Sequence, residues 1–309
     1  PASSLIINFA LAACPCFQLY GNPEDAVLFL QYPSHQLQEE RDKTLLMLKN
    51  RKHVRIIAMV HDVESLRAVC QDSRRRAEFD FMLETADVII VHNDCMLRYF
   101  SELGFSERRM VSIGLFDYLC EEKNSGRKYF DKSVTIAGNL GSDKSPYIRD
   151  LCKLAPLKVH LYGPNYECSM ADAGGNIEYH GSFPSGRIPG VIKGGFGLVW
   201  DGESVETCAG VTGNYLRFNN PHKLSLYLAA GLPVIIWKEA AEASFVETHG
   251  VGFAVESLFE IREILEWMDE AGYERYLQAV RKVSAMLTGG EYTKIAIHKA
   301  EEILGECAG

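Results

Sequence analysis

The sequence predicts an α/β protein with two doubly wound, Rossmann-like domains. Short apolar runs such as 54–60 and 194–200 alternate with stretches of helical length, and strands that alternate with helices imply a parallel sheet. The alternation stops in the polar segment 117–132 and then begins again. The 309 residues therefore divide into two domains of ordinary size, which we place at 1–130 and 131–309. The last helix can also pack back on the N-terminal domain.

The first half contains apolar runs that predict strands at 25–32, 54–60, 86–92 and 110–114. Helices are expected at 37–50, at 64–84 and after Asn93, which can cap a helix that Gly104 ends. Residues 5–13 could form a strand or a helical turn, and residues 17–20 a short strand. A doubly wound domain usually opens with a strand and a glycine-rich turn, and the first 24 residues contain no such turn.

The second half repeats the alternation. Strands are predicted at 133–137, 157–162, 176–180, 194–200, 232–237 and 252–255, and helices at 145–153, 221–230, 257–270, 272–287 and 291–305. Residues 183–192 contain prolines and glycines and are expected to form a loop with one short helix. The segment 203–218 is rich in glycine and threonine, and we expect a mobile surface loop there.

The stretch 219–237 is the most informative in the chain. Asn219 or Asn220 can cap a helix whose first position suits Pro221, and Gly231 ends that helix before a buried strand. Together with the preceding strand, these residues form a βαβ unit.

The N-terminus of this helix favours an anion through its N–H groups and its dipole. His222 and Lys223 stand in the first turn, where a cation is mildly unfavourable for an isolated helix. Their presence therefore suggests a bound phosphate. The alternative is a solvated lysine on an ordinary helix.

Composition narrows the class of protein. The formal net charge of −9 argues against nucleic acid or an anionic membrane as the partner. No apolar run reaches the roughly 18 residues needed to span a bilayer, and the apolar stretch 5–16 lacks the basic flank of a signal peptide. Nine scattered cysteines without a CxxC pair indicate a reducing compartment, the cytoplasm. No cysteine or histidine cluster has zinc-ligand spacing, so no metal site is expected.

Ligands of doubly wound sheets bind at the carboxyl ends of the strands. In the first half, His61 and Asp62 follow a predicted strand. In the second half, the corresponding positions are 138–141, 162–165, Asp201 and the helix start at 219–223. Asp201 could bind a sugar hydroxyl or simply close a turn.

The sequence resembles the bacterial glucosyltransferase-3 family, whose relatives include β-1,6-galactofuranosyltransferases. The resemblance rests on GGFGLVW at 194–200, NNPHKLSLYLAAGLPVI at 219–235, IIAMVHDV at 56–63, ADVIIVH at 86–92, AGNL at 137–140 and VGFAV at 251–255. It extends from about residue 25 to about residue 305. The KLSLYLAAGLPVI core is specific in combination, and its AxGxPV part is shared across many nucleotide-sugar transferases.

This resemblance implies a GT-B fold, with two Rossmann-like domains facing a cleft, and a sugar-nucleotide donor. It also implies inverting transfer to a glycan or glycoconjugate and assembly into a homo-oligomer, a dimer or tetramer. At the matched positions, Lys223 would hold the donor diphosphate, with Asn219, Asn220 and His222 beside it at the helix start. Further donor contacts would come from Gly138, Asn139 and Leu140, and contacts near the nucleoside from Tyr162, Gly163, Ser182 and Phe183.

Chemistry adds two expectations. A leaving diphosphate must be stabilised by a metal or by cations and N–H groups. The chain lacks an Asp-x-Asp motif, so Lys223 and the helix dipole are the expected device, and neither a metal nor another cofactor is expected. Inversion needs a base for the acceptor hydroxyl, for which Asp62 is the first candidate and His61 the second. Alternatively, Asp62 only caps the following helix.

The functional hypothesis is transfer of a hexose, glucose or galactofuranose, from a UDP-sugar. Two alternatives stay open. One is a nucleotide-sugar epimerase, and the other is a non-catalytic GT-B-like partner of another transferase, which the missing N-terminal glycine turn keeps open.

Overall fold

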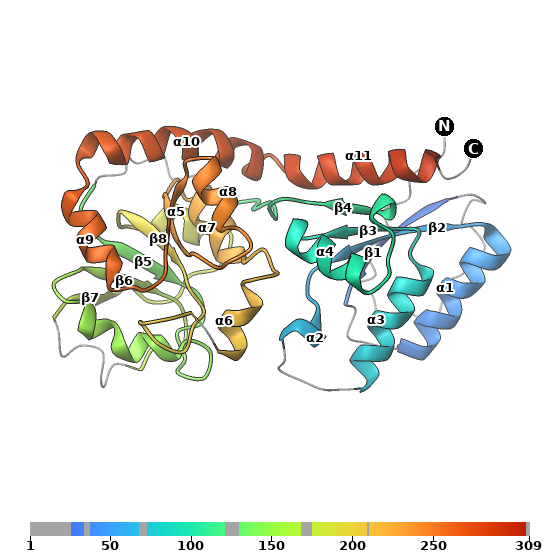
Figure 1. Ribbon diagram of the computed structural model, residues 1–309, viewed down its shortest axis with the longest axis horizontal. Coiled ribbons are helices and arrows are strands. Elements are labelled where there is room, and N and C mark those ends of the chain that lie inside the picture. Colours follow the sequence, from blue (N-terminus) through green and yellow to red (C-terminus); the bar gives the residue numbers. More distant parts are fainter. Residues whose placement is uncertain are drawn as a thin grey trace. The chain divides into compact units, whose positions relative to one another are not determined.

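A computed structural model describes residues 26–33, 38–67, 73–120, 130–167, 175–208 and 210–306 (Figure 1). The chain divides into a first unit, Pro1–Gly114 with Lys294–Gly309, and a second unit, Leu115–Thr293. The division at 114/115 precedes the predicted boundary because Leu115 is buried in the core of the second unit. The Tyr118 N–H also donates to the Leu287 carbonyl at 3.2 Å. The predicted strands or turns at 5–13 and 17–20 lie outside the described residues.

The first unit contains a parallel sheet with strand order β1-β2-β3-β4. Its strands are β1 Val27–Tyr32, β2 Arg55–Val60, β3 Val88–Val91 and β4 Met110–Ser112, and its helical segments are α1 Gln38–Lys52, α2 Glu64–Arg67, α3 Ser73–Thr85, α4 Asp94–Glu102 and η2 Glu107–Arg109. The four predicted strands are confirmed. The predicted cap is confirmed as well, because the Asn93 side chain accepts from the N–H groups of Cys95 and Met96. The described strands follow chain order without a reversal.

The second unit is a doubly wound sheet of six parallel strands in the order β10-β9-β8-β5-β6-β7. The strands are β5 Val134–Ala137, β6 Val159–Tyr162, β7 Ile177–Tyr179, β8 Phe196–Val199, β9 Val234–Trp237 and β10 Gly252–Val255. The chain winds outward from β5 through β6 to β7 and then returns to β8 on the other side of β5. The gap between β5 and β8 is therefore the topological switch point, where such sheets bind ligands.

Helices of the second unit follow the prediction with three differences. They are η3 Pro146–Leu154, α5 Ile188–Val191, α6 Val211–Tyr215, α7 His222–Ala229, α8 Ala243–Thr248, α9 Glu260–Trp267 and α10 Glu270–Thr288. The segment predicted at 145–153 is a 3-10 helix rather than an α-helix, and α8 was not predicted. The predicted mobile loop at 203–218 is wrong. That segment contains α6 and buries Val205, Cys208 and Leu216 in the core, because its small polar residues are interrupted by apolar ones.

The last helix, α11 Glu291–Glu306, belongs to both units, since the division of the chain falls at 293/294. In the first unit, the Arg55 guanidinium donates to the Leu304 carbonyl at 2.8 Å and so joins the helix to β2. Ala296, Ala300 and Leu304 form its buried face. These contacts account for residues 294–309 clustering with the N-terminal part of the chain.

Two further features bear on the protein class. Within the described ranges, no helix combines the length and apolar character needed to cross a bilayer. The four cysteines in the described part of the chain, Cys95, Cys120, Cys152 and Cys208, are free thiols.

Candidate functional site

Helix α7 begins at the carboxyl edge of the second sheet. It starts at His222, and Pro221 is its N-cap residue, with an extended backbone (φ −70°, ψ 128°) and no side-chain cap. The prediction that Asn219 or Asn220 caps this helix is therefore wrong. The helical hydrogen bonds begin from the Pro221 carbonyl, which accepts the Leu224 N–H at 2.9 Å, so the asparagines precede the cap.

Tyr227 anchors this helix over the switch point. Its ring lies flat against Gly197 of β8, where any β-carbon would overlap the ring. Its hydroxyl accepts the Ala137 N–H at the end of β5 at 2.8 Å. One side chain thus joins α7 to both strands that border the switch point, and it fixes the position of Lys223 one turn earlier.

Lys223 forms an ion pair at the switch point. Its Nζ lies 2.5 Å from a carboxylate oxygen of Asp201, which follows β8, and 3.4 Å from the Trp200 carbonyl. The two side chains are only 18% and 27% exposed, so Lys223 is not the solvated lysine of the alternative interpretation. Burial alone would lower the pKa of the Lys223 ammonium, but the Asp201 carboxylate reverses this and leaves the pKa raised. The lysine is therefore charged at neutral pH.

Two glycines allow the loops after β5 and β6 to approach this lysine. Gly138 has φ +145°, and a β-carbon there would lie 3.2 Å from Cε of Lys223. Gly163 has φ +144°, and a β-carbon there would overlap the Gly138 carbonyl oxygen. The Lys223 side chain thus passes directly over a backbone that lacks side chains, as a phosphate-binding turn requires.

Cys208 holds the backbone of Asp201 through a hydrogen bond. Its sulfur accepts the Asp201 N–H at 3.3 Å, and burial raises the pKa of its thiol to about 12. It is therefore a neutral thiol that orients the loop rather than a nucleophile.

The ring of Tyr147 is fully buried, and its hydroxyl has no hydrogen-bond partner among the described residues. Neither residue was predicted, because Cys208 carries no local signal for a hydrogen bond to Asp201 and Tyr147 lies in a segment remote in sequence.

Of the other predicted donor residues, some shape a loop and some are buried in the core. The Asn139 side-chain oxygen accepts from the Gly141 N–H and from Asn165, so it shapes the loop after β5. Leu140 and Tyr162 are buried in the core of the second unit, and the Tyr162 hydroxyl accepts the Lys193 N–H at 3.0 Å. Leu140 and Tyr162 could therefore contact a donor only through their main chain.

The remaining predicted residues are more accessible. Ser182 is exposed, and half-buried Phe183 lies beside Tyr162 with their ring centroids 6.2 Å apart. His222 is exposed and stacks on Phe116 at 5.0 Å. Asn220 is buried, and the Oδ1 atom of Asn219 is buried without a hydrogen-bond partner among the described residues.

In the first unit, His61 and Asp62 follow β2 as predicted. His61 Nε2 makes a short contact with Gln31 Oε1. Asp62 Oδ2 lies 3.2 Å from the Arg67 guanidinium, and both side chains are more than a third exposed. This ion pair is a third role for Asp62, beside base and helix cap. It was not predicted, although Arg67 lies only five residues further along the chain.

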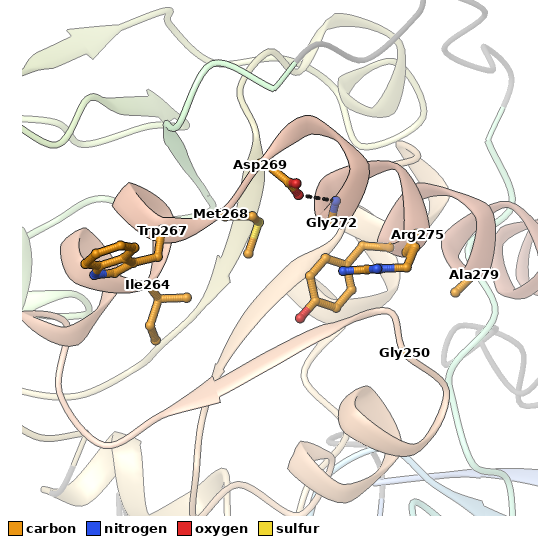
Figure 2. Close-up of a pocket in the computed structure, with 9 residues that line it drawn as sticks. Gly250, Ile264, Trp267, Met268, Asp269, Gly272, Arg275 and Ala279 are labelled. Atoms are coloured by element: carbon orange, nitrogen blue, oxygen red, sulfur yellow. Dashed lines mark hydrogen bonds between the residues drawn. The ribbon is translucent and has the colours of Figure 1, made fainter.

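A pocket of about 580 Å³ lies elsewhere in the second unit (Figure 2). It is lined by Gly250, Ile264, Trp267, Met268, Asp269, Gly272, Arg275, Tyr276 and Ala279. Gly250 precedes β10, so the pocket borders the amino edge of the parallel sheet. Lys223, Asp201 and Gly138 follow or face the carboxyl ends, where ligands of such sheets bind, and the pocket is therefore not the candidate site.

The Gly163 contact predicts a stability effect. We expect Gly163→Ala to destabilise the second unit by about 3 kcal/mol or more, because it combines positive-φ strain with overpacking. Urea denaturation followed by tryptophan fluorescence measures this, since Trp200, Trp237 and Trp267 all lie in the second unit. Gly181→Ala is the matched control, because Gly181 has φ +87° with no atom near its β-carbon position. Equal losses in the two variants would contradict the Gly163–Gly138 contact.

The fold and the site at the switch point define the class of protein to which this chain belongs. The fold is of the GT-B type, and this chain belongs to the glucosyltransferase 3-like family. The family's C-terminal domain model matches residues 134–300, and its N-terminal domain model matches residues 19–115. These two ranges agree with the division of the chain around residue 115.

Two curated relatives are glycosyltransferases. The β-1,6-galactofuranosyltransferase WbbI of Escherichia coli (strain K12) is 36% identical over 260 residues, which are 82% of this chain and 72% of WbbI. Glucosyltransferase 3 of Streptococcus gordonii is 28% identical over 258 residues, which are 81% of this chain and 72% of that protein. Sugar transfer is thus the activity of both.

Solved structures show the same fold at low identity. Anabaena HepE in complex with UDP has a TM-score of 0.61 and 12% identity, and the match covers 91% of this chain and 79% of HepE. Sucrose-phosphate synthase from Thermosynechococcus elongatus has a TM-score of 0.57 and 14% identity, and the match covers 91% of this chain and 74% of the synthase chain. These likenesses concern the fold alone.

Proposed function

We propose that this protein is a hexosyltransferase that uses a UDP-sugar, binds the donor diphosphate at Lys223 and needs no divalent metal for transfer. The observation that carries the proposal is the placement of Lys223 at the switch point, in the first turn of a helix without a side-chain cap. A lysine and the N-terminus of a helix together favour an anion. The glycosyltransferase relatives support a sugar nucleotide as that anion.

The ion pair suggests how a donor would bind. As a unit, Lys223 and Asp201 are neutral, so a diphosphate must compete with the carboxylate for the ammonium. An ammonium has three N–H donors, and the contacts with Asp201 and Trp200 leave one of them for a phosphate oxygen. Asp201, relieved of part of this interaction, would accept a hydroxyl of the donor sugar. In this scheme Asp201 orients Lys223 before the donor arrives.

The acceptor side of the reaction is assigned to the first unit. We propose that Asp62 takes the proton of the acceptor hydroxyl during an inverting displacement and that the leaving diphosphate is stabilised by Lys223. The relatives transfer glucose or galactofuranose, and we propose one of these two sugars with a glycan or glycoconjugate acceptor.

The donor proposal predicts metal-free nucleotide binding. UDP should raise the melting temperature of the protein in the presence of EDTA, because a ligand at 100 times its Kd stabilises the folded state by about 2.7 kcal/mol. UMP, which lacks the second phosphate, should give a clearly smaller shift if the diphosphate is held by Lys223. A shift that appears only with added manganese or magnesium would contradict metal-free binding.

Product analysis tests the reaction itself. UDP-glucose and UDP-galactofuranose are incubated with the protein and candidate glycans, and free UDP and new glycosides are identified by mass spectrometry. Formation of free UDP together with a hexose-extended product supports the proposal. Conversion of one UDP-sugar to another without release of UDP would instead indicate an epimerase.

A further inference from the structure

Three potential metal ligands meet at the far edge of the second sheet. His160 lies on β6, and Glu178 and His180 lie on or directly after β7, the last strand of that sheet. His160 and Glu178 are register partners across the two strands. His180 is two residues beyond Glu178, so both side chains project from the same face. Sheet pairing, rather than spacing in the sequence, brings the three together.

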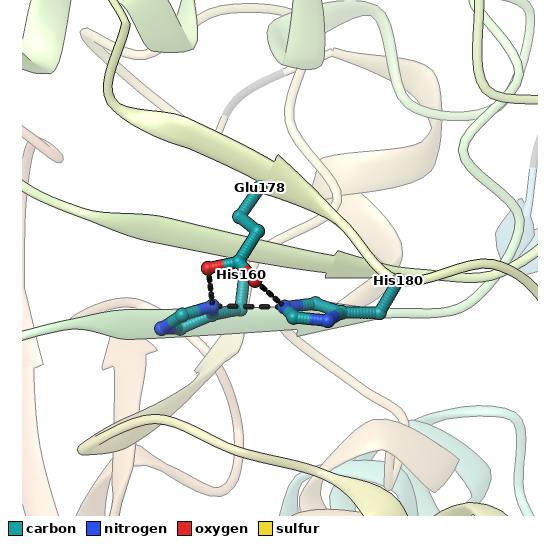
Figure 3. A group of neighbouring side chains, drawn as sticks. All are labelled: His160, Glu178 and His180. Carbon is teal, nitrogen blue, oxygen red and sulfur yellow. Dashed lines mark hydrogen bonds and ion pairs between the residues drawn. The ribbon is translucent and has the colours of Figure 1, made fainter.

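Their distances match a tetrahedral site. Nδ1 of His160 lies 3.0 Å from Nε2 of His180, and the two Glu178 oxygens lie 3.5 and 3.6 Å from these two nitrogens (Figure 3). Zinc–nitrogen bonds of 2.0–2.1 Å in a tetrahedron place neighbouring ligand atoms about 3.3 Å apart. Figure 3 shows the Glu178 carboxylate beside the line that joins the two imidazoles, with one oxygen facing each. The three residues therefore need little rearrangement to share one ion.

The surroundings suit a metal more than a proton. His160 is buried and the His180 side chain is 15% exposed, and Nδ1 of His160 lies only 3.0 Å from Nε2 of His180, so these two nitrogens cannot both carry a proton. Neutral imidazole is the form that binds a metal ion. Without an ion, one of the two facing nitrogens must donate its N–H to the other, and that proton is then not directed at the Glu178 carboxylate.

Asp131 supplies the supporting charge. One of its oxygens lies 3.9 Å from Nε2 of His160, and the other is held by the N–H and hydroxyl of Ser133. If Nδ1 binds a metal, the ring proton lies on Nε2 and faces this carboxylate. Nε2 is buried and has no hydrogen-bond partner among the described residues. An imidazole between a metal and a carboxylate is a common arrangement in zinc sites.

We propose that His160, Glu178 and His180 bind one zinc ion at the edge of the second sheet, with a fourth position open to solvent. Two nitrogens and one carboxylate suit zinc, whereas magnesium prefers oxygen ligands. The Glu178 side chain is 64% exposed, so water can reach the ion. The site lies on β6 and β7, whereas the switch point lies between β5 and β8. It also differs from the expectation, based on ligand spacing, that the chain has no metal site.

The test measures zinc binding directly. The full chain is stripped with a chelator, the chelator is removed, and zinc is titrated in competition with a chromophoric indicator. We expect one zinc ion per chain and a rise in the melting temperature, because the ion joins the edge strand β7 to β6. His180→Phe keeps a ring that can stack on Tyr162, which now lies 4.6 Å from the His180 ring, but it removes the ligand nitrogens. Glu178→Gln removes the charge at an exposed position.

Both variants should lower zinc affinity by more than about 100-fold, since even the loss of supporting partners costs 10–100-fold. His298→Ala is the matched control, because His298 and Glu302 form an exposed surface pair at 3.6 Å, and it should leave the affinity unchanged. Cobalt-loaded protein should lack thiolate-to-metal charge-transfer absorption. Wild-type affinity in both folded variants, or cysteine ligation in the cobalt spectrum, would overturn the proposal.

Discussion

Asp62→Asn is expected to lower the rate of sugar transfer by about 10²–10⁴-fold while UDP affinity stays unchanged. Asparagine has nearly the same size and caps a helix about as well as aspartate, but it cannot accept the proton of the acceptor hydroxyl. Steady-state rates with a UDP-sugar and an acceptor, together with a UDP titration, measure both quantities. If Asp62 is only a helix cap, activity and stability should both survive the change.

The contact with Arg67 requires its own control. Asp62 and Arg67 form a partly exposed ion pair, and such pairs contribute about 1 kcal/mol or less. Arg67→Met removes the pair but keeps the carboxylate. If Asp62 is the base, Arg67→Met should retain most of the activity that Asp62→Asn loses. Equal activity in both variants would end the catalytic assignment and direct attention to His61, whose ring contacts Gln31.

Lys223→Ala is expected to weaken UDP binding by about 1.5–3 kcal/mol, or about 10–150-fold, for the loss of a charge-assisted hydrogen bond. Transfer should slow as well, because the leaving diphosphate loses its cation. Isothermal titration with UDP and initial rates of transfer measure the two effects. Lys238→Ala is the matched control, because Lys238 forms a similar 2.6 Å ion pair with Glu256 on an exposed surface.

A stability effect accompanies this change. Asp201 is only 27% exposed, and a partly buried carboxylate without its partner costs about 1–3 kcal/mol. The double variant Lys223→Ala with Asp201→Ala should recover most of that stability, because no charge is left unpaired. It should not recover UDP affinity. Recovery of both would mean that Lys223 is a structural residue and would remove it from the donor site.

Local sequence patterns were sufficient for most of the secondary structure. The run 232–237 predicted a strand, and β9 occupies Val234–Trp237. Asn93 was predicted to cap a helix, and it does. These features depend on neighbours within a few residues, where alternation, caps and glycines act. Local patterns failed at two places. They missed α8, because a short helix leaves a weak signal, and they placed the cap of α7 on an asparagine instead of on Pro221.

The site was predicted only in part. Its location at the carboxyl ends of the strands followed from the strand–helix alternation. The pairing of Lys223 with Asp201, the support of Asp201 by Cys208 and the overlap that excludes a side chain at Gly163 did not follow. The first and third contacts join segments that follow different strands, and their separation depends on strand order, which residue types do not determine. The second lies within one loop, whose fold no local pattern indicates.

The sequence by itself determined that this is an α/β chain with two parallel sheets and the signature of the glucosyltransferase 3-like family, because periodicity and short motifs are local properties. Only the tertiary structure decided which charges meet. Lys223 is paired instead of solvated because β8 and α7 converge at the switch point. His160, Glu178 and His180 converge because β6 and β7 pair in register. Both outcomes depend on sheet pairing, which brings together side chains that the sequence keeps apart.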